Sequence, residues 1–188
     1  MELEVKNKGK KAYIIEFMCI VLFSVCLFLS GLEYLNRIVF QVLAFLFALI
    51  FLYIFFRFLN ISYLYQIGPR DKSIYADRNL LKALPPSEIE LEIKKRKGRR
   101  YWQTDALFSL GNLKEFATVG SADELDRIKK EKGLKIYYYT VSISYYPCSL
   151  LVFDGEGSDD DTPSGLLMEL DGEMSDLIKH ISENRINL

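Results

Sequence analysis

The stretches AYIIEFMCIVLFSVCLFLSGL, residues 12–32, and IVFQVLAFLFALIFLYIFF, residues 38–56, decide the fold of this chain. The first carries a single charge, Glu16, and the second carries none. A helix needs about 20 apolar residues to cross a hydrocarbon layer about 30 Å thick, and both stretches reach that length. The polar break at Glu33–Arg37 is long enough to turn the chain. We therefore predict a hairpin of two transmembrane helices, over about residues 12–32 and 38–59.

The polar segment before the first helix predicts the orientation of the hairpin. Residues 1–11 hold four lysines, whereas the break between the helices holds only Arg37. Basic residues stay on the cytoplasmic side, so we expect residues 1–11 to form a cytoplasmic basic tail. Two crossings then return residues 60–188 to the cytoplasm, which predicts a multi-pass protein of the inner or plasma membrane. A cleaved signal peptide is the alternative, but no small-x-small cleavage site follows the first apolar stretch.

Composition narrows the function classes. Residues 1–60 carry six Lys or Arg and four acids, whereas residues 61–188 carry 18 Lys or Arg and 21 acids. The domain is therefore mildly acidic, which does not indicate a general nucleic-acid binder. Cys19, Cys26 and Cys148 include no CxxC pair, which agrees with a reducing compartment for the domain. The single histidine, His180, excludes a His-rich metal site. We predict no cofactor and no metal.

After Asn60 the sequence alternates between apolar and polar residues, which is typical of half-buried strands. Glu88–Lys97 shows this best, because Ile89, Leu91 and Ile93 fall on one side and glutamates on the other. Trp102, Thr104, Ala106 and Phe108 would share one face of the returning strand. We predict strands over residues 61–67, 72–77, 88–97, 100–110, 112–119, 134–144, 149–153 and 165–170, with Leu80–Pro86 ending at a proline pair.

Two helices are predicted in the same domain. Ser121 to Glu124 forms a capping box, and Gly133 is a C-terminal cap. Near the end of the chain, one apolar stripe at helical spacing predicts a structural helix; its residues are Met174, Leu177, Ile178 and Ile181.

Short strands followed by one C-terminal amphipathic helix resemble a pleckstrin-homology (PH)-like antiparallel β-barrel closed by its last helix. With the hairpin in front, the chain resembles the bacterial small membrane proteins that carry a cytoplasmic PH-like domain. The resemblance is one of architecture and carries over no functional residue. It implies a membrane α-helical hairpin followed by a mainly β (α+β) domain that binds or scaffolds rather than catalyses, although fold does not fix function.

The densest charge cluster surrounds one predicted hairpin turn. Its six bases are Lys94, Lys95, Arg96, Lys97, Arg99 and Arg100. One hypothesis is a contact with anionic lipid. The other is a solvated strand tip whose charges prevent edge-to-edge pairing. Base stacking by Tyr101 and Trp102 would suit nucleic acid, but Glu88, Glu90 and Glu92 adjoin the cluster.

Charged and small residues in the apolar stretches give further candidates. Glu16 and Arg57 lie at matching depths of antiparallel helices, which predicts an intramembrane pair. Small residues at helical spacing would let helices approach closely, in the hairpin or in a homo-oligomer; they are Cys26, Ser30, Ala44 and Ala48.

Other sequence patterns do not indicate chemistry. Asp154–Asp161 is acidic, but the sixth and twelfth positions of a calcium loop hold Asp159 and Gly165, so we expect a flexible loop. Motifs typical of hydrolases, metalloproteases and nucleotide binders are missing from the sequence. We therefore predict a non-catalytic, membrane-anchored module that binds a protein partner or anionic lipid. The alternative is an accessory subunit of a transporter or secretion complex, acting through its helices.

Overall fold

The computed structural model describes the chain except for residues 7–9, 33–35, 75–76, 143–146, 155–162 and 187–188. The chain divides into two compact units. One consists of Lys6–Ser62 and Val141–Ser144. The other consists of Met1–Val5, Tyr63–Thr140 and Tyr145–Leu188. The predicted acidic loop lies almost entirely outside the described residues, so the structure does not address it.

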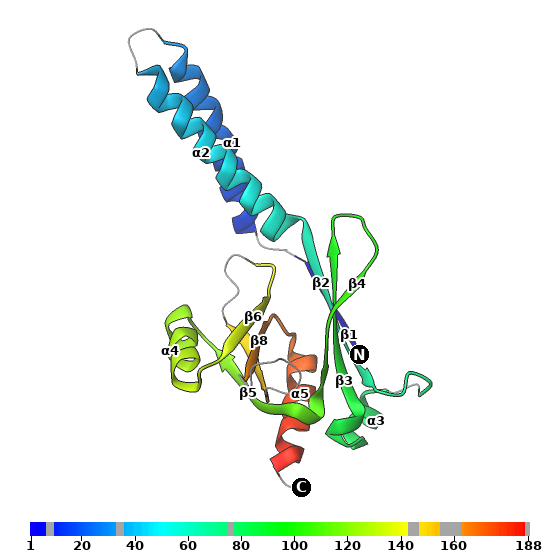
Figure 1. Cartoon of the computed structure of the whole chain (residues 1–188). Helices are drawn as coiled ribbons and strands as arrows, with labels where there is room; N and C mark the ends of the chain where they lie inside the picture. Colours follow the sequence, from blue (N-terminus) through cyan, green and yellow to red (C-terminus); the bar gives the residue numbers. More distant parts are fainter. Residues whose placement is uncertain (7–9, 33–35, 75–76, 143–146, 155–162, 187–188) are drawn as a thin grey trace. The chain divides into compact units, whose positions relative to one another are not determined.

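The first unit is a helical hairpin. Helix α1 covers Lys10–Ser30, α2 covers Arg37–Ile54, and the π-helical turn η1 covers Phe55–Leu59. The two long helices pack along each other (Figure 1), and small side chains such as Cys26 and Ala44 are buried between them. Both helices are long and apolar enough to cross a membrane, as predicted. Asn36 caps α2, since its side chain accepts a hydrogen bond from the N–H of Val39 at 3.4 Å.

The second unit contains two four-stranded sheets (Figure 1). The first has the order β1-β2-β3-β4; these strands cover Glu2–Lys6, Ile61–Pro69, Ile89–Lys97 and Gln103–Ser109. The second has the order β5-β7-β8-β6; these strands cover Leu113–Val119, Cys148–Phe153, Ser164–Met168 and Lys135–Tyr139. The α+β class is therefore confirmed. The described strands form no closed barrel, so the PH-like barrel is not confirmed, and β6 pairs with β8 in parallel.

Part of the predicted polar tail is a strand, β1. Met1 and Ile67 exchange backbone hydrogen bonds of 2.7 and 2.8 Å, which is the reciprocal pattern of antiparallel strands. Val5 is buried, and Gln66 of β2 donates to the carboxylate of Glu2. The helical hairpin is thus inserted between two strands that are neighbours in one sheet.

Aromatic side chains join the two sheets. The Tyr65 hydroxyl donates to the carbonyl of Tyr139, and the rings of Tyr63 and Tyr139 meet edge to face at 5.5 Å. The rings of Phe108 and Phe153 lie 4.9 Å apart. Burial raises the pKa of the Tyr65 hydroxyl well above its usual range. These contacts show that aromatic side chains pack between the two sheets.

The helices of this unit follow the capping signals. Helix α4 covers Ala122–Lys132; Ser121 Oγ accepts from the N–H of Glu124 at 3.3 Å, and Gly133 adopts φ 61°. Glu124 completes the cap by accepting from the N–H of Gly120 at 2.8 Å. Helix α5 covers Gly172–Ile186, contacts β5, and buries the whole predicted stripe.

Two strand predictions need correction, and the segment before Pro85 is a helix. Residues 72–74 form a turn, in which the N–H of Ser73 donates to Asp71 at 3.0 Å, and residues 75–76 are outside the described part. Helix α3 covers Arg78–Ala83 and ends before Pro85. The 3-10 turn η2 follows and covers Pro86–Glu88. The predicted strand 134–144 is shorter, because β6 ends at Tyr139.

Strand β4 also departs from the predicted alternation. Ile93 pairs with Ala106 but Lys94 pairs with Thr104, so Asp105 is an extra residue in a β-bulge. Ala106 therefore shares the inner face with buried Ile93, whereas Thr104 shares the outer face with Lys94. The predicted single face of Thr104, Ala106 and Phe108 is wrong for this reason.

Candidate functional site

The six predicted bases lie where β3 and β4 extend toward their connecting turn (Figure 1). We call residues 94–104 the basic arm and Lys97–Tyr101 the arm tip. Gly98 adopts φ 62°, a left-handed conformation that favours glycine and makes the turn tight. The strands thus bring all six bases onto one hairpin, but their surroundings differ.

Two of the six bases are engaged by protein groups. Lys94 Nζ lies 3.4 Å from a carboxylate oxygen of Glu92. Arg96 Nη2 lies 2.8 Å from Glu4, and its guanidinium carbon lies 4.4 Å from the ring centroid of Trp102. Both side chains are only about a quarter exposed. Lys94 and Arg96 therefore serve the fold of the sheet rather than an external ligand.

Three of the other four bases belong to the arm tip, and Lys95 lies two residues before it. Lys97, Arg99 and Arg100 are exposed, and Lys95 Nζ lies 5.7 Å from the ring centroid of Tyr63. A hollow of about 210 Å³ lies here; its lining consists of Lys95, Lys97, Arg100, Tyr101, Gln103, Thr104 and Asp105. Asp105 is the one acid in that lining. The arm tip is thus a cationic surface with one carboxylate beside it.

Tyr101 is the most exposed large apolar side chain of the described residues, with 94% of its surface accessible. From the sequence, Tyr101 is a candidate only for base stacking. An aromatic ring in water beside three exposed cations suits an interface that is apolar on one side and charged on the other. Sequence alone could not separate it from Trp102, which Arg96 covers.

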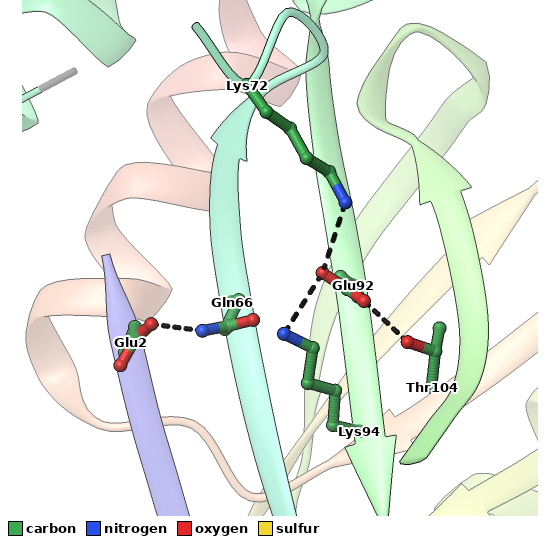
Figure 2. A network of polar contacts seen from close by, with 6 residues as sticks. All are labelled: Glu2, Gln66, Lys72, Glu92, Lys94 and Thr104. Carbon is green, nitrogen blue, oxygen red and sulfur yellow. Dashed lines mark hydrogen bonds and ion pairs between the residues drawn. The ribbon is translucent and has the colours of Figure 1, made fainter. Parts of the chain in front are cut away.

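The glutamates of β3 do not neutralise the arm tip. Glu90 pairs with Arg70 at 3.6 Å. Glu92 lies 4.0 Å from Lys72 and accepts a hydrogen bond from Thr104 at 2.6 Å, in addition to its contact with Lys94 (Figure 2). These acids are occupied by local bases on the outer face of the sheet.

The pKa of Glu92 reflects this network. Partial burial raises the pKa, but the hydrogen bond from Thr104 and the charges of Lys94 and Lys72 outweigh burial and lower it from 4.5. Glu92 is therefore an anion at neutral pH, fixed within the polar network that Figure 2 shows. This network organises the sheet face on which the arm begins.

The arm tip lies at the end of the sheet where β2 begins. At the opposite end, the N–H of Arg70 donates to the carbonyl of Glu88 at 2.6 Å. Counting back along β2 and forward along β3 from this pair brings Tyr63 opposite Lys95, in agreement with their 5.7 Å contact. The end of β3 that leads to the arm tip therefore lies beside the start of β2, which follows η1 in the chain.

The predicted pair in the hairpin stays a prediction. Glu16 on α1 and Arg57 on η1 are both half-buried, and α1 contacts η1. The guanidinium carbon of Arg57 lies 5.3 Å from the ring centroid of Phe58. Contact between these two elements agrees with antiparallel helices, whose opposite ends meet.

The three cysteines and the histidine lie outside residues 94–104 in the sequence. All three cysteines are buried thiols, and burial raises the pKa of Cys148 to about 12, which disfavours a reactive thiolate. His180 is half-buried on α5. Within the described part of the chain, no group of three or more His, Cys, Asp or Glu side chains is arranged to hold a metal ion.

No protein-family model matches the chain, and no curated protein or solved structure is significantly similar to it. What the domain does therefore has to be inferred from its own residues.

Proposed function

We propose that this chain is a membrane-anchored, non-catalytic interaction or scaffolding protein whose α+β domain binds a protein partner or anionic lipid. The observation that carries the proposal is the insertion of an apolar helical hairpin between the paired strands β1 and β2. A sheet whose neighbouring strands flank an anchor in the sequence stays tethered to the bilayer. Such a placement suits a module that recruits or holds something there.

Exposure of the hairpin supports the anchor. Most apolar side chains of α1 and α2 are uncovered, including Phe28 at 71% and Ile38 at 72% exposed. A core helix of a water-soluble protein buries such side chains, and a large uncovered apolar surface marks an interaction site. The 21 residues of α1 extend about 32 Å at about 1.5 Å per residue, enough for the hydrocarbon layer.

Chain connectivity supports a two-crossing topology. The pairing of β1 with β2 in one sheet supports a hairpin whose entering and leaving segments lie on the same side of the membrane. The lysines of residues 1–11 favour the cytoplasm for that side. We propose cytoplasmic termini in an inner or plasma membrane, with the architecture, though not the closed barrel, of small membrane proteins that carry PH-like domains.

Site-specific photo-crosslinking in intact cells tests the binding role. A crosslinker replaces Arg99 at the arm tip in one variant and Arg127 of α4 in the control, both of which are exposed. We expect a discrete lipid or protein adduct from position 99 and none from position 127. Extraction of the full chain from membranes at alkaline pH, without detergent, would contradict the anchor.

A second function is favoured by the surface of the helices. An apolar hollow of about 370 Å³ lies on the hairpin; its lining consists of Cys19, Ile20, Phe23, Phe47, Ala48, Phe51 and Leu52. A helix of another subunit would fill such a hollow by close packing. The chain would then be an accessory subunit of a transporter or secretion complex. Ala48→Leu should release a helix-bound partner in mild detergent, whereas Phe45→Leu, at an exposed position outside this hollow, should retain it.

A further inference from the structure

The position of the arm tip on the sheet restricts what it can meet. The chain from Leu59 of η1 to Tyr63 spans at most roughly 14 Å when fully extended. Tyr63 in turn contacts Lys95, and β3 continues from there toward the arm tip. A domain of this size is more than about 30 Å across, so its opposite end would lie beyond electrostatic reach of the bilayer. The bases therefore lie at the end of the sheet to which the anchor is joined.

The chemistry of the arm tip matches a membrane surface. Lys97, Arg99 and Arg100 are exposed cations, and Tyr101 presents an almost fully exposed ring beside them. Basic side chains near a bilayer are attracted by anionic headgroups, and tyrosine is enriched at the boundary between headgroups and hydrocarbon.

Local ion pairs leave this attraction nearly undiminished. Glu90 and Glu92 are paired with Arg70, Lys72 and Lys94, so they do not offset the arm tip. The lining of the hollow contains one acid, Asp105, and three bases, so its net charge is positive. Screening at physiological salt acts over about 8 Å, so only charges near the headgroups contribute.

We propose that the arm tip docks on the anionic surface of the same bilayer that holds the helices. Lys97, Arg99 and Arg100 contact headgroup phosphates and carboxylates, and Tyr101 enters the interface. This inference rests on the proposed function, because it needs the hairpin in the membrane. The contact adds a second attachment point to the tether, and two points fix which face of the domain is presented to the cytoplasm.

The protein carries its own probe for this contact. Trp102 is the only tryptophan of the chain and follows Tyr101 directly, so all indole emission comes from the arm. The full chain is reconstituted in nanodiscs of phosphatidylcholine, with or without phosphatidylglycerol, that contain lipid spin-labelled on the headgroup. We expect Trp102 to be quenched more strongly in the anionic discs. Raising the salt to about 1 M, where screening acts over about 3 Å, should remove the difference.

Charge-matched variants assign the effect. Reversal of Lys97, Arg99 and Arg100 to Glu should abolish the extra quenching in anionic discs, whereas Arg99→Lys with Arg100→Lys should retain it. The control reverses three exposed bases of α4, Arg127, Lys129 and Lys130, and should behave as wild type. Tyr101→Ser should reduce the quenching without changing the charge, which keeps the test valid if the triple reversal unfolds the domain.

The outcomes separate this inference from the proposed function. Equal quenching in neutral and anionic discs, or equal loss in the α4 control, would overturn docking by the arm tip. Stable incorporation into discs without any quenching would overturn docking and leave the anchor intact. Failure to incorporate would instead reject the anchor. Protection of Trp102 only after a protein partner is added would assign the arm tip to that partner and overturn the lipid contact.

Discussion

Arg96 of β3 reaches across β2 to Glu4 of β1, and its Nη2 lies 2.8 Å from the Glu4 carboxylate. The same guanidinium covers the ring of Trp102 at 4.4 Å. One side chain therefore links the strand that leads into the helical hairpin to the base of the arm tip. This link orients the arm with respect to the edge of the sheet.

Arg96→Gln is expected to expose Trp102, because the planar cation that covers the indole is removed. Indole emission should shift to longer wavelength and acrylamide quenching should increase, while the free energy of unfolding falls by about 1 kcal/mol for a pair at the sheet surface. Arg96→Lys keeps the charge but not the planar stack, so it should restore the emission only in part. Unchanged emission in both variants would contradict the stacked arrangement.

Gly111→Ala is expected to destabilise the domain by about 1–3 kcal/mol, the usual cost of overpacking. A Cβ at this position would lie 2.8 Å from the Cα of Ser87, and backbone cannot move aside as a side-chain end can. Gly68→Ala is the control, since its Cβ would meet nothing within 4 Å, and it should change stability by at most about 0.5 kcal/mol. Urea unfolding of the full chain in mild detergent, followed by circular dichroism, measures both.

Leu177→Ala should lower the free energy of unfolding by about 2–5 kcal/mol, because the side chain is fully buried on α5. Lys179→Ala, at an exposed position on the same helix, should have almost no effect. The same urea experiment compares them. Equal stability of the two variants would mean that α5 is not part of the core.

Glu92→Gln should weaken the sheet in a pH-dependent way. The folded-state pKa of Glu92 is lowered from 4.5, so its stabilising effect is fully present above the unfolded-state pKa and disappears as the pH falls through the folded-state value. The difference in thermal midpoint between wild type and variant should be largest near neutral pH and shrink below about pH 4.5. A constant difference down to acidic pH would show that the Glu92 charge has no role.

Glu16 and Arg57 are expected to be coupled at the membrane boundary. Removing either charge alone leaves the other in a poor solvent, so Glu16→Gln and Arg57→Gln together should cost less than the sum of the single changes. Thermal stability of the detergent-solubilised chain gives the three values of the cycle. Additive effects would mean that the two residues do not interact.

Patterns with strong local causes were predictable from the sequence. The length of the apolar stretches predicted both helices, the alternation around Leu91 predicted β3, and the stripe containing Leu177 predicted α5. The cap at Ser121 and the stop at Gly133 are also local and are confirmed. The six bases were found in sequence because they cluster within residues 94–100, and the hairpin turn was marked by Gly98.

Features that depend on distant residues were not predictable in this way. Glu2 to Lys6 alternates in polarity, but its partner β2 lies beyond both helices, so nothing nearby identifies it as a strand. The parallel pairing of β6 with β8 and the bulge at Asp105 are likewise set by partner strands. Glu92 and Glu4 decide that Lys94 and Arg96 form ion pairs within the sheet. The exposure of Tyr101 depends on the packing around it.

The insertion of the hairpin between β1 and β2 also sets an order of events during synthesis. β1 is made first, but its partner is made only after both apolar helices have been translated. Until then β1 has no neighbour in the sheet, and an unpaired strand is open to wrong partners. β1 and β2 can therefore pair at the edge of the first sheet only after both helices of the hairpin have been synthesised.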